Sequence, residues 1–216
     1  MKKTITKLLV ILLSASFISG CTFIFQVGRR SDSEKIDKLS KQVDQLSKVK
    51  SLLEQRLAQE IQDKQVSLKM SERGLVITFL ADILFDSGKN QIKTDAYPIL
   101  NKVARILQEN VPDLKVGIEG HTDNVPIKFS GWKSNWELST ARGLSVLHYL
   151  VDEKGVSPER ISAIGYGEHS PVSSNSSAEG RKLNRRVEVV IYPKVTKVRG
   201  EQNPEEKAYV PSGKIK

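Results

Sequence analysis

The sequence of 216 residues contains a single cysteine, Cys21, and few aromatic residues, which make up 6% of the chain. One cysteine excludes an intramolecular disulfide and a cysteine-rich zinc site. The three histidines, His121, His148 and His169, fall in different predicted elements without the spacing of metal ligands. The sequence therefore predicts neither a disulfide-stabilised scaffold nor a metal centre.

Motifs of enzyme chemistry are also scarce. The chain has no Gly-x-Ser-x-Gly motif, and the glycine-containing stretch at 165–168 follows a predicted strand but opens no helix, unlike a dinucleotide-binding motif. A catalytic triad is defined by geometry rather than by composition, so we do not favour one built from Ser139, His121 and Asp123. We expect no cofactor and no catalytic activity.

The N-terminus lacks acidic residues and a long hydrophobic run. Three lysines precede an apolar stretch at 8–17, about half the ~20 residues of a membrane-spanning helix, so a permanent span is the weaker interpretation. The pattern at 1–20 is typical of an export signal. Residues 18–21, Ile-Ser-Gly-Cys, resemble the lipobox of bacterial lipoproteins, which implies cleavage before Cys21 and acylation of that residue. The alternative is an ordinary signal with an incidental cysteine.

The chain is basic, with 34 Lys and Arg against 25 Asp and Glu and a net charge of +9. Removal of residues 1–20 would take away three lysines and leave about +6 (9 minus 3). We expect no nucleic-acid partner for an exported chain. The positive charge suits an anionic lipid layer or cell-wall polymer through long-range attraction that salt weakens.

A heptad pattern follows a short tether. Residues 21–33 show no apolar period, whereas in residues 34–64 apolar side chains recur at a and d positions, with Lys50 at one a position. These apolar residues are Ile36, Leu39, Val43, Leu46, Leu53 and Leu57. The pattern predicts a coiled-coil-type spacer helix of ~48 Å, and a homo-oligomer through residues 36–57 is possible. The alternative is a single amphipathic helix that lies on the domain.

Residues 65–193 predict one α+β domain, and residues 194–216 a flexible basic tail. Period-two and β-branched runs predict five strands, at 66–70, 75–80, 114–120, 161–164 and 186–192. Thr94 is a candidate cap for one helix, and Ser134 with Glu137 forms a capping box for a second. The order is β-β-α-β-α-β-β, with two helices packed on one side of a mixed sheet.

A dense polar stretch at 119–124 ends the third predicted strand, a common position for binding groups. At 100° per residue the next helix has two faces. We expect one to face the core: Ala141, Leu144, Leu147, His148 and Val151. Asn135, Leu138 and Arg142 share the other, facing solvent beside Asp123. A carboxylate and a guanidinium placed there complement a free amino acid; an Asp123–Arg142 ion pair is the alternative.

Several motifs in this region, in the same order, resemble the OmpA-like C-terminal domain, the peptidoglycan-associated module of many envelope proteins. They lie at 83–88, 120–123, 135–142, 160–161, 165–168, 171 and 180–187. The resemblance covers about residues 75–193 and implies non-covalent binding of the peptidoglycan stem peptide, chiefly its diaminopimelate residue. Asp123 and Arg142 match the positions that bind the amino-acid end of that residue. Neighbouring pocket positions are matched by Asn135, Leu138, Thr122, Phe85 and Asp86.

Two features stand apart from this resemblance. The family usually has alanine where this chain has Gly143, at a cost of up to ~1 kcal/mol of helix propensity. Arginines that flank a final strand often pair with nearby carboxylates, so we leave Arg181, Arg185 and Arg186 out of the predicted binding site.

These observations predict a non-enzymatic lipoprotein of the bacterial outer membrane, held in the lipid bilayer by acylated Cys21, with a periplasmic domain that binds peptidoglycan. The alternative is a stator-type anchor within an envelope complex, because 121–127 and 135–139 look most like flagellar motor proteins of the MotB type. Such a protein would need a membrane span with an acidic residue, and residues 1–20 contain none. A wall hydrolase is a third possibility.

Overall fold

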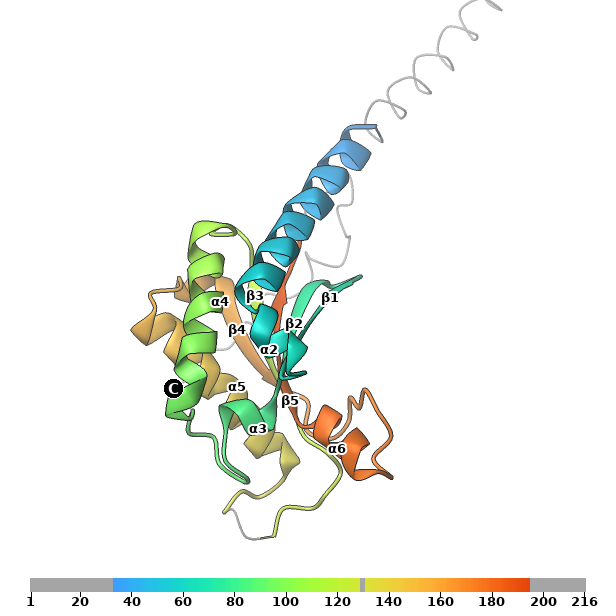
Figure 1. The fold of residues 1–216 in the computed structure, drawn as a ribbon, viewed down its shortest axis with the longest axis vertical. Helices are drawn as coiled ribbons and strands as arrows, with labels where there is room; N and C mark the ends of the chain where they lie inside the picture. Colours follow the sequence, from blue (N-terminus) through green and yellow to red (C-terminus); the bar gives the residue numbers. More distant parts are fainter. Residues whose placement is uncertain (1–32, 129–130, 195–216) are drawn as a thin grey trace, which may run out of the picture.

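A five-stranded sheet forms the centre of the protein in the computed structural model, which describes residues 33–128 and 131–194 (Figure 1). The strand order is β1-β2-β5-β3-β4; β3 and β4 are parallel, and the other neighbouring pairs are antiparallel. The predicted α+β class with a mixed sheet is confirmed. The predicted signal, Cys21 and residues 195–216 of the predicted tail lie outside the described residues.

The five strands and the two predicted helices of the domain follow the predicted order, and two short helices, at 81–84 and 178–184, are additional. The strands are β1 Val66–Ser71, β2 Gly74–Leu80, β3 Val116–His121, β4 Ile161–Gly165 and β5 Arg186–Ile191. The helices are one over residues 33–56, then α2 Ala58–Gln62, α3 Ala81–Leu84, α4 Tyr97–Glu109, α5 Asn135–His148 and α6 Ala178–Asn184. Short helical turns lie at η1 Thr94–Ala96, η2 Tyr149–Glu153 and η3 Pro158–Arg160. Within the described residues, no helix combines the length and apolar character that a membrane span requires.

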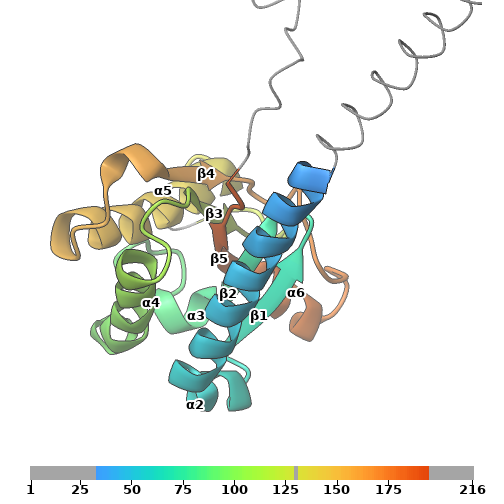
Figure 2. The same cartoon turned by 90° about the horizontal axis from the view of Figure 1, so that it is seen from above.

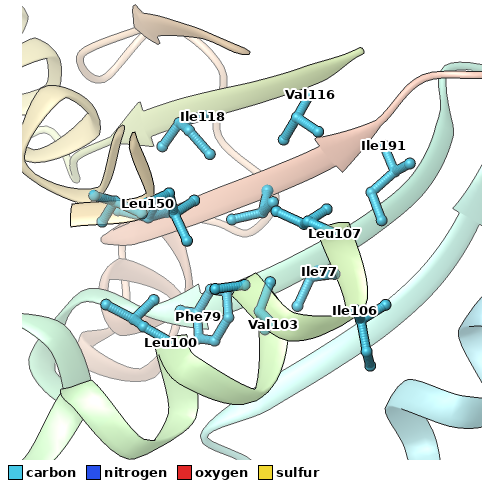
Figure 3. Packing of buried hydrophobic residues seen from close by; sticks show 14 of the residues in the cluster. Ile77, Phe79, Leu100, Val103, Ile106, Leu107, Val116, Ile118, Leu150 and Ile191 are labelled. Carbon is cyan, nitrogen blue, oxygen red and sulfur yellow. The ribbon is translucent and has the colours of Figure 1, made fainter. Parts of the chain in front are cut away.

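The core lies on one face of the sheet. Alternate residues of β2 and β5, such as Ile77 and Ile191, point to this face because side chains in a strand alternate sides. Leu100 and Val103 of α4 pack over them (Figure 3). The prediction of helices on one side of the sheet is confirmed for α4 and α5. The helix over residues 33–56 joins them in the same core.

The helix over residues 33–56 has two unlike halves. Its second half and the next turn bury Leu46, Val49, Leu53 and Leu57 against the domain. Ile36, Leu39 and Val43 of the first half are 69%, 59% and 48% exposed, and Figure 1 shows this half projecting from the domain. The predicted seam over 36–57 is therefore wrong in its second half, where the alternative of an amphipathic helix lying on the domain holds.

Helix geometry explains which residues are buried there. A straight α-helix has 3.6 residues per turn and drifts away from a 3.5-residue heptad seam. Val49, rather than the seam position Lys50, accordingly faces the domain, and the Lys50 ammonium pairs with Glu54 on the helix surface. The apolar stripe serves intramolecular packing.

The helix starts agree only partly with the expected caps. Thr94 begins the turn η1 and forms no capping hydrogen bond. Ser134 caps α5 as predicted: its Oγ accepts from the Trp136 N–H at 3.2 Å and contacts the Glu137 carboxylate. The helical segment that starts there continues through η2 and ends before Gly155, whose φ of +68° suits a glycine.

Helix α5 buries the face that was expected to point to solvent. Its buried residues are Asn135, Leu138, Ser139, Arg142, Gly143 and Val146, whereas Leu144 on the predicted core face is 41% exposed. The reason is a close approach of α5 to β3. A Cβ added to Gly120 would lie 2.0 Å from the Ser139 carbonyl oxygen. Small residues permit this contact, and the larger side chains on the other face would prevent it.

Candidate functional site

A pocket of about 670 Å³ lies at the end of β3. Figure 1 shows α3 and α6, which border this pocket, at the opposite end of the molecule from the projecting helix. The loop after β3, the start of α5, the region of α3 and the region of α6 form its walls. Its lining includes Asp82, Ser87, Gly88, Thr122, Asp123, Asn135, Leu138, Arg142, Arg181 and Arg185. Five of the seven predicted ligand-binding residues are among them.

Asp123 is 7% exposed and is held by two groups. Its Oδ1 accepts from the Val125 N–H at 3.1 Å, and its Oδ2 accepts from an Arg185 Nη at 2.8 Å. The other Nη of Arg185 lies 3.5 Å from Asp82. Burial opposes the charge on Arg185, but the two aspartates outweigh it and raise the arginine pKa. Within the described residues, Asp123 therefore forms its ion pair with Arg185. The alternative, a direct ion pair between Asp123 and Arg142, is not observed.

Arg142 is 4% exposed and contacts backbone carbonyls instead of carboxylates. Its Nε donates to the Lys89 oxygen at 2.9 Å, and an Nη donates to the Asp86 oxygen at 3.4 Å. Its guanidinium carbon lies 5.2 Å from the centre of the Phe85 ring. Burial lowers its pKa to about 10, so the group stays charged at neutral pH. Within the described residues this buried cation forms no ion pair.

The expectation that Asp123 and Arg142 face solvent is wrong. Both side chains are more than nine-tenths buried, because α5 turns the Arg142 face inward and the loop after β3 folds over it. A ligand that reaches them is therefore largely withdrawn from water. Charge-assisted hydrogen bonds are stronger in such surroundings than at an exposed surface.

Asn135 fastens the loop after β3 to the first turn of α5. Its Nδ2 donates to the carbonyl oxygens of Asp123 and Val125 at 3.3 and 3.2 Å and to a Glu168 carboxylate oxygen at 2.7 Å. Leu138 provides an apolar part of the wall and is 5% exposed. The Thr122 hydroxyl is buried and has no hydrogen-bond partner within the described residues.

Phe85 and Asp86 lie behind Arg142 instead of lining the pocket. Phe85 is 2% exposed and lies beneath the guanidinium. Asp86 contributes its backbone carbonyl, while its carboxylate points to the Lys89 ammonium at 3.4 Å. The structure therefore gives these two predicted pocket positions a supporting role, because both orient the arginine.

The arginine cluster belongs partly to the pocket, which corrects its exclusion from the predicted site. Arg181 and Arg185 line the pocket, whereas Arg186 pairs with Glu188 at 2.7 Å as expected for an arginine flanking a strand. Arg185 and Arg186 stand where β5 begins, and consecutive side chains of a strand point to opposite faces. The sequence alone could therefore have indicated that Arg185 and Arg186 point to different sides of the sheet and have different partners.

The residues of the disfavoured triad do not bond to one another. The Ser139 hydroxyl donates to the Trp136 carbonyl at 3.0 Å and accepts from the Gly167 N–H at 2.9 Å. The His121 ring stacks on Tyr166 with 5.0 Å between ring centres. This arrangement gives the serine no base.

An ion-pair network lies on the face of the sheet opposite the hydrophobic core. Glu119, His121 and Glu188 bring possible metal-ligand atoms within 4.8 Å of one another. Arg73 already bonds to both carboxylates, at 2.6 Å to Glu119 and 3.0 Å to Glu188, and Arg186 bonds to Glu188. Burial, and secondly the charge of Arg186, lowers the His121 pKa to about 4. The cluster is thus already neutralised by cations of the chain.

Comparison with known proteins identifies this region, since residues 84–185 match the model of the OmpA family. They form an OmpA family domain. Motility protein B of Bacillus subtilis (strain 168) is 39% identical over 166 residues, 77% of this chain and 59% of that protein. Outer membrane porin F of Pseudomonas aeruginosa is 37% identical over 116 residues, 54% of this chain and 32% of the porin. The chain spans less than two thirds of either relative.

A solved structure shares the fold of the OmpA domain. The structure of the cell wall anchor of the T6SS from Pseudomonas aeruginosa aligns with a TM-score of 0.60 and 34% sequence identity. The alignment covers 66% of this chain and 97% of that one. The predicted resemblance and fold class are both confirmed.

Proposed function

We propose that the OmpA domain binds peptidoglycan non-covalently through the stem peptide, with diaminopimelate in the pocket at the end of β3. The observation that carries this proposal is the buried Arg142 guanidinium, which has no carboxylate partner within the described residues and shares the pocket with Asp123. The solved T6SS protein, described as a cell wall anchor, supports a wall ligand.

The two charged groups divide the ligand between them. The Arg142 guanidinium donates hydrogen bonds to the free carboxylate of diaminopimelate, and the Asp123 carboxylate accepts from its ammonium. Arg185 holds the Asp123 carboxylate in place, so binding begins from an oriented acceptor. The pocket selects a zwitterion by placing opposite charges on its two sides.

Co-sedimentation with purified sacculi tests the proposal. Asp123→Asn and Arg142→Gln should weaken binding by roughly 30-fold or more, because loss of one partner of a desolvated charge pair costs about 2–5 kcal/mol. Lys182→Gln, which removes an exposed charge from α6 outside the pocket lining, is the matched control and should pellet normally. Thermal unfolding monitors the fold of each variant. Full pelleting of folded Arg142→Gln contradicts the site, as does failure of free diaminopimelate to compete with sacculi for the unaltered chain.

We further propose a binding module without catalysis, which requires no cofactor. A wall hydrolase is the competing class. Incubation of sacculi with the protein should release no soluble muropeptides, whereas release that depends on the chain would show turnover.

We propose that acyl chains on Cys21 attach the protein to the outer membrane and that the OmpA domain lies in the periplasm. Its support is the lipobox at 18–21 and the lack of acidic residues in 1–20. A stator-type anchor in an envelope complex is the second candidate, favoured by the 39% identity with Motility protein B. Mass spectrometry of the mature N-terminus distinguishes them, because only the lipoprotein carries acyl chains on Cys21.

A homo-oligomer is proposed only through the exposed first half of the N-terminal helix. Ile36, Leu39 and Val43 remain available there, whereas the later seam residues are buried in the chain's own domain.

A further inference from the structure

Trp136, the second residue of α5, presents a large aromatic surface to solvent. The side chain is 48% exposed. Its indole stacks on the His169 ring, with 4.8 Å between ring centres and 21° between planes. The two rings form an aromatic stack, here called the Trp136–His169 platform.

The platform starts one residue from the pocket wall. Asn135, which lines the pocket, donates to the Glu168 carboxylate at 2.7 Å. The next residue of each partner, Trp136 and His169, makes the stacked pair. Gly167 lies between the two sites as well. Its carbonyl accepts from the Thr122 N–H at 2.9 Å, and a Cβ added to it would lie 3.5 Å from the Trp136 indole. Pocket and platform are therefore held by neighbouring residues of the same two segments.

We propose that the Trp136–His169 platform binds an N-acetylhexosamine ring of the glycan strand that carries the stem peptide. This inference rests on the proposed binding of the stem peptide. The apolar C–H face of a sugar ring packs on an exposed indole, while its polar edge stays in water. A linker of two amino-acid residues and the lactyl group of the sugar separates diaminopimelate from the sugar ring, and each extended residue adds about 3.5 Å or more. A sugar attached to a bound stem peptide therefore reaches a residue that adjoins the pocket wall.

Paired ligands test the proposal by calorimetric titration: the free stem tripeptide, and the same tripeptide joined to its disaccharide. For the unaltered chain we expect the disaccharide to strengthen binding by about three- to tenfold, in line with one good aromatic contact. Trp136→Ala should abolish this gain and leave the affinity for the free tripeptide unchanged. Trp136→Phe, which keeps a flat ring, should retain most of the gain.

Leu183→Ala is the matched control, because Leu183 is 49% exposed on α6 and should leave the gain intact. Equal affinities of the unaltered chain for the two ligands would overturn the platform but not the pocket, and so would a full gain in folded Trp136→Ala. If neither ligand binds the unaltered chain, the proposed function itself fails. Should Trp136→Ala unfold, the two-ligand comparison with the unaltered chain still decides, because equal affinities overturn the platform.

Discussion

Burial of single charged residues sets both the chemistry and the stability of this protein. Arg142 keeps a full positive charge against two backbone carbonyls, and Arg185 is balanced by two aspartates. The folded state bears the desolvation cost of Arg142 until an anion binds. A ligand carboxylate at this position therefore stabilises the fold as well as the complex.

His121 predicts a pH dependence of stability. Its pKa is about 4 in the folded chain, against 6.5 for an unperturbed histidine. Between these values the unfolded chain binds a proton that the folded chain does not, so stability is complete above pH 6.5 and is lost as the pH falls towards 4. We expect roughly 2 kcal/mol less free energy of unfolding at pH 4.5 than at pH 7. Urea unfolding at several pH values measures this difference.

His121→Gln provides the comparison, because glutamine does not titrate. Its free energy of unfolding should change much less over the same range. The pKa of Glu188 is lowered from its ordinary value of 4.5. The stability that this carboxylate contributes is therefore lost mainly below pH 4.5, outside the range from pH 4.5 to 7 over which His121 is tested. Identical pH curves for the two proteins would refute the assignment to His121.

The site residues show how far a sequence reaches at this scale. Asp123 and Arg142 follow from their motifs and from the chemistry of a zwitterion, and both line the pocket. Their burial does not follow, because it depends on how α5 rotates against the sheet. Arg185 is missed for a related reason: its partner Asp123 is 62 positions away in the chain, and only the folded sheet brings them together.

At the scale of elements, two glycines lie where α5 contacts β3. Replacing them with alanine should change the free energy of unfolding in opposite directions. A Cβ on Gly143 would lie 3.4 Å from the Ile118 oxygen, an ordinary contact, and one on Gly120 would lie 2.0 Å from the Ser139 oxygen. Gly143→Ala should raise the free energy of unfolding by about 0.5–1 kcal/mol through helix propensity. Gly120→Ala should lower it by about 3 kcal/mol or more, because backbone must move. Chemical denaturation of both variants checks the pair, and a stabilised Gly120→Ala would exclude so close a contact.

The two halves of the N-terminal helix predict different mutational costs. Leu53 is fully buried in the core, so Leu53→Ala should cost about 2–5 kcal/mol. Leu39 is 59% exposed, so Leu39→Ala in the monomer should change stability by no more than ~0.5 kcal/mol. Urea unfolding at low protein concentration makes the comparison. Similar losses at both positions would mean that the first half is packed as well.

Periodicity predicts the long elements and fails for the short ones. The stripe of α4 and the alternation of β2 extend over enough residues to reveal their period. Helix α3 has four residues and α6 has seven, too few turns for a hydrophobic face to repeat. The heptad pattern correctly indicates a helix over 33–56, but an apolar stripe suits a neighbouring domain as well as a second helix, and periodicity alone does not choose between them.

At the scale of the whole molecule, the proposed anchor predicts where the protein is found. Cys21→Ser should move the protein from the membrane to the soluble periplasmic fraction, because acylation requires the thiol. Cell fractionation followed by immunoblotting measures the distribution, with Asp123→Asn as a control that should remain in the membrane fraction. Retention of Cys21→Ser in washed membranes would argue for a different attachment.

The projecting helix and the elements α3 and α6, which border the pocket, lie at opposite ends of the vertical axis in Figure 1, and Figure 2 shows the helix from above. A mechanical pull between the two ends therefore travels through the buried leucines that join helix and domain. Force along that axis shears their packing sideways instead of peeling it apart one residue at a time, so many contacts resist together. The helix should detach under tension only at forces that already threaten the core, and the ligand pocket keeps its shape until then.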